Sequence, residues 1–228
     1  MEEDEPVTWK SEEEKLGWIR EKLYTPVVSD TLDGLGFKHQ AMRHDIRPLH
    51  PDFIVVGRAR TLLWMATYEP VKPNPYVNEI RAIDSLRPGD VAVHSTDHSW
   101  TVAPWGELLS TASKMRGSTG TIVDAVVRDV KRIVAMGFPT FARGIMPLDS
   151  WGRGFVADVD VTIQCGGVEV KSGDLVFGDY DGVVVIPRAV EDEVLERALR
   201  KATSENHTRD ELLQGRLLAE VYEKYGVL

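Results

Sequence analysis

The sequence predicts an α/β fold in which mixed sheets are flanked by helices at both ends of the chain. In the middle of the chain, residues 106–116 and 129–136 have helical patterns, and residues 121–127 and 140–142 have strand patterns. This βαβ-type alternation favours parallel pairing of the strands. The charged stretch 191–225 carries leucines and valines that need a surface to cover them, so we expect a C-terminal helical region.

The N-terminal part is expected to form two short helices. Ser11 and Glu14 have the spacing of a capping box, and Pro26 is expected to end the helix that follows. Ser29 is expected to cap the second helix, and Gly34 and its neighbours to stop it. The apolar residues at helical spacing in the first helix are Leu16, Ile19 and Leu23.

Further elements follow from local patterns. Residues 53–64 are predicted to form a strand, 70–75 a proline-rich loop and 76–86 a helix, and the turn Pro88-Gly89-Asp90 leads into a strand over residues 91–93. After residue 156 the pattern changes, with an alternating strand over 159–163, a hairpin turn at Gly166-Gly167, a second alternating strand over 168–170 and a buried strand over 183–186.

Composition limits the classes of protein to consider. The chain has 228 residues, 43% of them hydrophobic, which is enough for a buried core, and a net charge of −9, which disfavours nucleic acid as a partner. Cys165 is the only cysteine, and the start is acidic, with no apolar run of the ~18 residues that would cross a bilayer. We therefore expect a cytoplasmic protein with no membrane partner. An acidic segment and helix, residues 1–25, would precede one domain, residues 26–228.

Two short motifs carry the chemistry. Gly106 and Glu107 lie where a loop enters a helix, and the free backbone N–H groups of a helix start suit a carboxylate. Arg128 and Asp129 follow the strand over residues 121–127, and ligands of open α/β sheets bind at such strand ends. Arginine can bind a carboxylate through two parallel hydrogen bonds, and aspartate can bind a hard divalent cation. From spacing alone, a helix-start acid beside a surface arginine is the better interpretation.

Several motifs together resemble the RraA-like family. That family contains the class II 4-hydroxy-4-methyl-2-oxoglutarate and 4-carboxy-4-hydroxy-2-oxoadipate aldolases and the protein regulators of ribonuclease E. The aldolases carry an acidic residue, twenty residues and then Arg-Asp, which here are Glu107 and Arg128-Asp129. Glu107 replaces the more usual Asp, and Ala125 replaces a more usual Gly. The other matches are Val28-Ser29-Asp30-Thr31-Leu32, Pro88-Gly89-Asp90-Val91, Gly178-Asp179-Tyr180-Asp181-Gly182-Val183 and Val221-Tyr222-Glu223-Lys224-Tyr225-Gly226.

The resemblance implies a role for each motif residue. The backbone of Gly106, Glu107, Leu108 and Leu109 would bind the substrate carboxylate, and Arg128 would bind the 2-oxo acid and stabilise developing negative charge. Asp129 would bind Mg²⁺ or Mn²⁺, and Glu107 would orient a water. Glu205 would reach the site from a neighbouring subunit. The family fold is a swivelling β/β/α domain that assembles as a homotrimer or a hexamer.

The implied reaction is retro-aldol cleavage of a 4-hydroxy-2-oxo acid to pyruvate and a carbonyl compound, with oxaloacetate decarboxylation as a side activity. The alternatives are a non-catalytic regulator of an RNA-degradation enzyme and an enzyme acting on another 2-oxo or sugar acid. Apart from Pro88-Gly89-Asp90-Val91, residues 65–104 match no family pattern, and we expect them to shape the pocket. Within them, His94, Asp97 and His98 are of types that bind transition metals, but a polar loop is the better interpretation.

Overall fold

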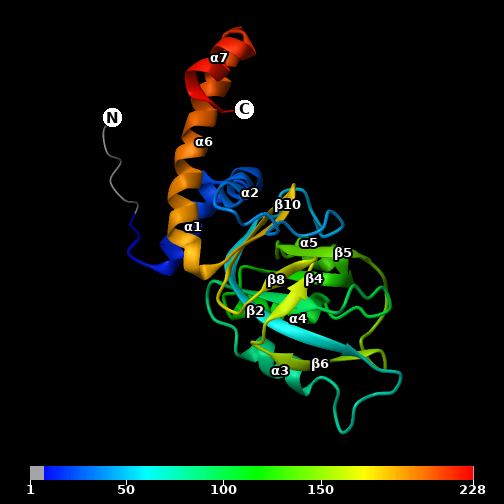
Figure 1. The fold of residues 1–228 in the computed structure, drawn as a ribbon. Coiled ribbons are helices and arrows are strands. Elements are labelled where there is room, and N and C mark those ends of the chain that lie inside the picture. Colours follow the sequence, from blue (N-terminus) through cyan, green and yellow to red (C-terminus); the bar gives the residue numbers. More distant parts are fainter. Residues whose placement is uncertain (1–7, 228) are drawn as a thin grey trace.

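The fold is known from a computed structural model, which describes residues 8–227. Within these residues an eight-stranded mixed sheet has the order β1-β5-β4-β3-β2-β9-β10, and β6 pairs with the far half of β2 (Figure 1). Neighbours from β2 to β5 are parallel, as the βαβ pattern predicts. The strands are β1 Arg47–Pro48, β2 Val55–Ala66, β3 Asp90–Ser95, β4 Gly120–Val127, β5 Thr140–Ile145, β6 Gly154–Val159, β9 Leu175–Asp179 and β10 Gly182–Ile186.

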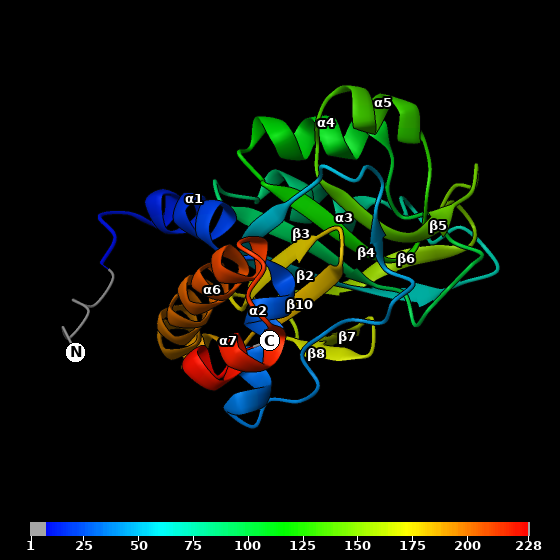
Figure 2. The same ribbon diagram turned by 90° about the horizontal axis from the view of Figure 1, so that it is seen from above.

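Helices cover the sheet in two groups. Figure 2 shows α4 and α5 side by side over the parallel strands, whereas α1 and α2 lie against α6. In Figure 1, α6 projects away from the sheet, on the side opposite α3, and α7 lies at its far end. The helices are α1 Glu12–Lys22, α2 Thr25–Gly34, α3 Val77–Asp84, α4 Glu107–Met115, α5 Val130–Ala135, α6 Glu191–Leu213 and α7 Leu218–Tyr225, with a short 3-10 turn at Arg188–Val190.

The central strand β4 explains how the core is built. All its residues are buried, and successive side chains face opposite sides of the sheet. Ile122 packs with Phe141 and its neighbours on one face, whereas Val123 packs with Trp105 and Ile133 under α4 and α5 on the other. A separate apolar cluster joins α1, α2 and the first half of α6 to β9 and β10. Apolar side chains therefore cover both faces of the sheet.

The predicted N-terminal helices exist, but two of their boundary residues were assigned wrongly. Ser11 does cap α1, accepting a hydrogen bond from the Glu14 N–H at 3.1 Å. Pro26, however, lies in the first turn of α2, where a missing N–H costs nothing, rather than ending α1. Ser29 lies inside α2, whose N-cap is Tyr24. Residues 1–7 of the predicted acidic segment lie outside the described part of the chain.

Two predicted continuous elements are interrupted. The alternating strand over 159–163 is divided between β6 and β7 (Ile163–Cys165), because Asp160 adopts a left-handed φ of 61° and binds Arg60. β7 then pairs with β8 (Val168–Val170) across the predicted glycine hairpin turn. The C-terminal helical region breaks between α6 and α7 at Gly215, where φ is +84°. Within residues 8–227, no helix is both long and apolar enough to cross a membrane.

Candidate functional site

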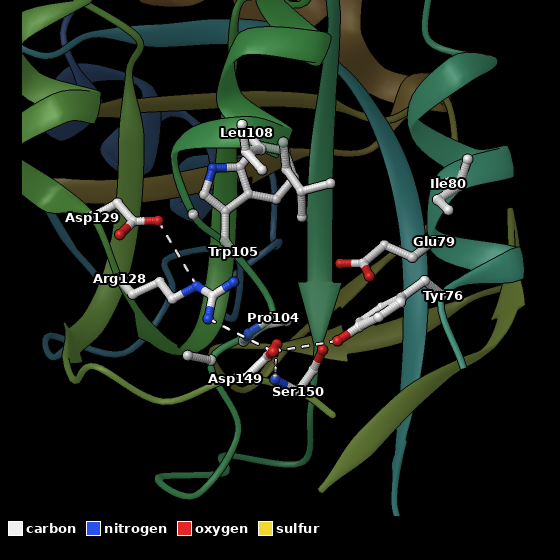
Figure 3. A pocket seen from close by; sticks show the side chains of 13 residues that line it. Tyr76, Glu79, Ile80, Pro104, Trp105, Leu108, Arg128, Asp129, Asp149 and Ser150 are labelled. Atoms are coloured by element: carbon white, nitrogen blue, oxygen red, sulfur yellow. Dashed lines mark hydrogen bonds and ion pairs between the residues drawn. The ribbon is translucent and has the colours of Figure 1, made fainter. Parts of the chain in front are cut away.

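A pocket of about 300 Å³ opens where the parallel strands β3, β4 and β5 end. The loops that follow these three strands contribute to its walls, and the start of α3 closes it from the other side (Figure 3). Both motifs singled out in the sequence reach it. Its lining residues are Tyr76, Glu79, Ile80, Ala103, Pro104, Trp105, Gly106, Leu108, Leu109, Arg128, Asp129, Asp149 and Ser150.

Backbone hydrogen bonds fasten the two motifs to each other. The Arg128 N–H donates to the Trp105 carbonyl at 3.0 Å, and the Glu107 N–H donates to Asp129 Oδ2 at 3.2 Å. Gly106 lies between these two contacts. A Cβ at Gly106 would come within 2.8 Å of Asp129 Oδ2 and 3.2 Å of the Arg128 side chain. The missing side chain therefore lets the loop before α4 approach the Arg-Asp pair.

Asp129 presents an open carboxylate at the pocket. It adopts a left-handed φ of 59° at the N-cap of α5, a conformation that aspartate tolerates better than most residues. Its carboxylate is 44% exposed and lies 3.8 Å from Arg128 Nε. Within residues 8–227, no three His, Cys, Asp or Glu side chains are grouped closely enough to hold a metal ion. A single open carboxylate fits Mg²⁺ or Mn²⁺, which keep several waters, better than zinc.

Arg128 extends across one wall of the pocket. Its Nη1 atom lies 3.4 Å from the Leu148 carbonyl and 3.8 Å from Asp149 Oδ2, and 40% of its side chain is exposed. These contacts are long, so the guanidinium remains able to bind an incoming carboxylate. Figure 3 shows the guanidinium between Asp129 and Asp149.

The start of α4 supplies backbone donors to the same wall. The Ser110 N–H makes the first hydrogen bond of the helix, to the Gly106 carbonyl at 3.1 Å. The amides of Leu108 and Leu109 precede it and have no partner of the helical type. Both residues line the pocket beside Arg128. A carboxylate bound there would receive both a guanidinium and the positive end of the helix dipole.

The two predicted catalytic glutamates lie outside this lining. Glu107 directs its carboxylate along the surface of α4, where it accepts from Thr111 Oγ1 at 3.3 Å and lies 3.8 Å from Arg132. Glu205 is on α6, hydrogen-bonded to Tyr24 and 3.2 Å from Lys201. In its own chain Glu205 therefore belongs to the helical region remote from α3 (Figure 1). The roles predicted for both residues stay predictions.

Sequence reasoning missed one wall of the pocket. Tyr76, Glu79 and Ile80 come from the start of α3, and Asp149 and Ser150 come from the loop after β5. The Tyr76 hydroxyl donates to Asp149 Oδ2 at 3.3 Å. The expectation that residues 65–104 shape the pocket is confirmed. The i, i+3, i+4 spacing of the three α3 residues places them on one helix face, but the sequence does not show that this face lines a pocket.

Glu79 is the buried acid of the pocket. Only 4% of the residue is exposed. Burial and, to a smaller extent, the negative charge of Asp149 raise the pKa of its carboxyl to about 8, and Arg128 acts in the opposite direction. Burial and Asp149 also raise the pKa of Tyr76. The pocket thus holds a carboxyl group that is largely protonated at neutral pH.

His94, Asp97 and His98 are not grouped as a metal site, and only Asp97 and His98 lie in the expected polar loop, because His94 belongs to β3. His94 is fully buried, and its Nδ1 accepts a hydrogen bond from the Trp64 indole at 3.1 Å. Burial lowers the pKa of His94 to about 3, so it stays neutral. His98 instead contacts the buried Asp124, at 2.6 Å, and Asp97 adopts a left-handed φ of 53°. His94 therefore belongs to the core under the pocket, and His98 lies in the loop that leads to it.

Comparison with known proteins identifies the family. The Aldolase/RraA family profile, RraA-like, matches residues 25–185, which is most of the chain. This protein belongs to the RraA-like family. A Halalkalibacterium halodurans protein named "Putative 4-hydroxy-4-methyl-2-oxoglutarate aldolase" is 33% identical to this RraA-like chain, over 86% of the chain and 87% of that protein. The resemblance inferred from the sequence motifs is therefore confirmed.

Solved structures resemble the RraA-like chain over nearly its whole length. A protein from Pseudomonas syringae pv. tomato strain DC3000 has a TM-score of 0.83 at 26% identity, covering 97% of this chain and 99% of its own. Streptomyces coelicolor RraAS2 is described as an unusual member of the RNase ES inhibitor RraA protein family. It has a TM-score of 0.77 at 27% identity, and the match covers 89% of this chain and 99% of RraAS2. The predicted α/β fold, with a mixed sheet and flanking helices, is confirmed.

Proposed function

We propose that this protein is a divalent-metal-dependent lyase that cleaves a 4-hydroxy-2-oxo acid to pyruvate and a carbonyl compound. The observation that carries the proposal is the pairing of Arg128 and Asp129 with the start of α4 in one pocket. Such a pocket offers a carboxylate anchor beside a cation-binding carboxylate. The aldolase name of the bacterial relative supports this class of reaction.

Substrate binding would use the wall formed by α4 and β4. The carboxylate of a 2-oxo acid would bind Arg128 and the backbone amides of Leu108 and Leu109. All three residues line the pocket. Breaking the C3–C4 bond leaves the electron pair as a pyruvate enolate, and Arg128 would stabilise its negative charge. Loss of CO₂ from oxaloacetate forms the same enolate, so this protein should also decarboxylate oxaloacetate.

Asp129 would hold the cation, with water at the remaining positions. Mg²⁺ or Mn²⁺ bound there supplies a Lewis acid that lowers the energy of the developing enolate. The hydrogen bond from the Glu107 N–H to Asp129 Oδ2 fixes the carboxylate, and Gly106 leaves the space it needs. Glu107 would orient a water after its carboxylate turns away from Thr111 and Arg132.

A screen for pyruvate release tests the proposal. The protein, freed of metal by a chelator, would be assayed on a panel of 4-hydroxy-2-oxo acids and on oxaloacetate, with and without Mg²⁺ or Mn²⁺. We expect cleavage that depends on added metal. The similarity to RraAS2 favours one alternative, a protein that regulates an RNA-degradation enzyme by contact. Inhibition of such a ribonuclease by a protein that releases no pyruvate from any substrate would favour the regulator.

We further expect a homotrimer or hexamer in solution. The first half of α6 packs on its own domain through Val194, Leu195 and Ala198, but its end and α7 leave large apolar side chains exposed. A second copy would cover them and could bring its own Glu205 near the pocket. The exposed residues are Leu213, Leu217, Leu218 and Tyr222, between 50% and 80% exposed.

Light scattering would measure the mass in solution. We expect three or six times the 25.5 kDa of one subunit. The double substitution Leu213→Glu and Leu217→Glu should lower that mass, whereas Met115→Glu, at an exposed position of α4, should not. A 25.5 kDa species at micromolar concentration would contradict the assembly and remove Glu205 from the site. Arg128 and Asp129 lie in a pocket of their own chain and would be unaffected.

A further inference from the structure

Retro-aldol cleavage needs a base, and the pocket contains one acidic group with no other evident task. Asp129 is bound by the Glu107 N–H, and Asp149 accepts from the Tyr76 hydroxyl and its own neighbour Ser150. Glu79 differs, because within residues 8–227 it is influenced by charge and burial alone, with no hydrogen bond. Burying a carboxyl without a hydrogen bond costs free energy, and this carboxyl lines the pocket instead of the closed core.

The position of Glu79 suits proton transfer. Figure 3 shows its carboxyl pointing into the pocket from α3, across from the wall that holds Arg128 and Asp129. A 2-oxo acid whose carboxylate binds that wall would extend its C4 hydroxyl toward α3. The apolar residues Ile80, Leu108 and Pro104 line the space between the two walls. Glu79 therefore faces the far end of the proposed substrate.

We propose that Glu79 is the general base that removes the C4 hydroxyl proton of the substrate. The proton moves from the C4 oxygen to a Glu79 oxygen, the C4–O bond becomes a carbonyl, and the C3–C4 electron pair becomes the enolate. Solvent then protonates C3, and Glu79 returns its proton to solvent. This inference rests on the proposed lyase function, and it supplies the base from the same chain that holds the substrate.

The charges around Glu79 set the expected pH dependence. The titratable and charged groups that line the pocket with it are Tyr76, Arg128, Asp129 and Asp149. A base must be deprotonated to act, and the pKa of Glu79 is raised to about 8 by burial and Asp149. The kcat/KM for cleavage, which reports groups of the free enzyme, should therefore rise with pH and level off above about 8. The pKa of Tyr76 is raised from 10.0, so Tyr76 stays protonated in this range.

The deciding experiment compares two reactions in one set of proteins. Cleavage of a 4-hydroxy-2-oxo acid and decarboxylation of oxaloacetate are measured with Mg²⁺ from pH 6 to 9.5 for the wild type, Glu79→Gln and a control, Glu69→Gln. Glu69 is an exposed glutamate in the loop before α3. Decarboxylation has no hydroxyl proton to remove. Glu79→Gln should therefore lose cleavage by about a hundredfold or more and lose its pH dependence, while decarboxylation stays within a few-fold.

A second variant tests the assignment without removing the base. Asp149→Asn removes a negative charge that raises the pKa of Glu79, so the rise in cleavage should move to lower pH. Glu79→Gln should fold with an unchanged or higher Tm, since it removes a buried unpaired acid.

Three results would overturn the inference: cleavage by Glu79→Gln close to wild type, equal loss of both reactions, or no shift for Asp149→Asn. In each case the wild type would still release pyruvate, so the proposed function would survive. A wild type that catalyses neither reaction with any metal would instead refute the proposed function, and the inference with it.

Discussion

Replacing Asp129 by alanine should abolish metal-dependent pyruvate release and leave the fold intact. The carboxylate is 44% exposed, and its hydrogen-bonded contact is the Glu107 N–H at 3.2 Å. Losing one such exposed contact lowers the free energy of unfolding by only about 1 kcal/mol. The cation, by contrast, would lose the only protein ligand proposed for it. We therefore expect that Asp129→Ala, even at saturating Mg²⁺, turns over no faster than the wild type from which a chelator has removed the metal.

The backbone at Asp129 calls for a second variant. Because φ is 59°, alanine adds a local backbone strain of about 1 kcal/mol, which asparagine avoids. Asp129→Asn should therefore keep the wild-type Tm and still lose activity. Asp52→Ala, at an 89% exposed position in a surface loop, serves as the control and should retain full turnover. Full Mg²⁺-dependent turnover in either Asp129 variant would show that the cation binds elsewhere.

Replacing Arg128 by lysine should lower the rate by two to three decades, about 2–4 kcal/mol in the transition state. Lysine keeps the charge but lacks the planar fork that binds a carboxylate at two points. In this pocket the guanidinium also spans from Asp129 to the Leu148 carbonyl, a reach that one ammonium group cannot reproduce. Steady-state kinetics on the best substrate of the screen would measure the loss.

Arg116→Lys provides the matched control for this substitution. Arg116 ends α4, its side chain is 53% exposed, and its contact with Asp84 is 3.8 Å long, so kcat and KM should not change. Circular dichroism would confirm that both variants are folded. Near-normal kcat and KM for Arg128→Lys would place this arginine outside the substrate site, whatever the result for Asp129.

The sequence by itself determined the family, the α/β class and the two motifs of the site. These are local properties: a β-branched run such as residues 121–127 predicts a strand, and residues at its end lie at the edge of a sheet. The family resemblance implied that the two motifs serve one site, and the Glu107–Asp129 hydrogen bond joins them in the structure. Local patterns failed where one residue changes the path of the chain, as at Asp160 and Gly215.

Only the tertiary structure decided which residues face those motifs. Glu79 is about fifty residues from Arg128 in sequence, and nothing in its local pattern separates it from a solvated helix acid. Its burial, and hence its raised pKa, exist only because α3 closes the pocket opposite β4 and the loop after β5 brings Asp149 beside it. The electrostatic environment of a side chain depends on neighbours from the whole fold, whereas helix and strand patterns depend on neighbours in sequence.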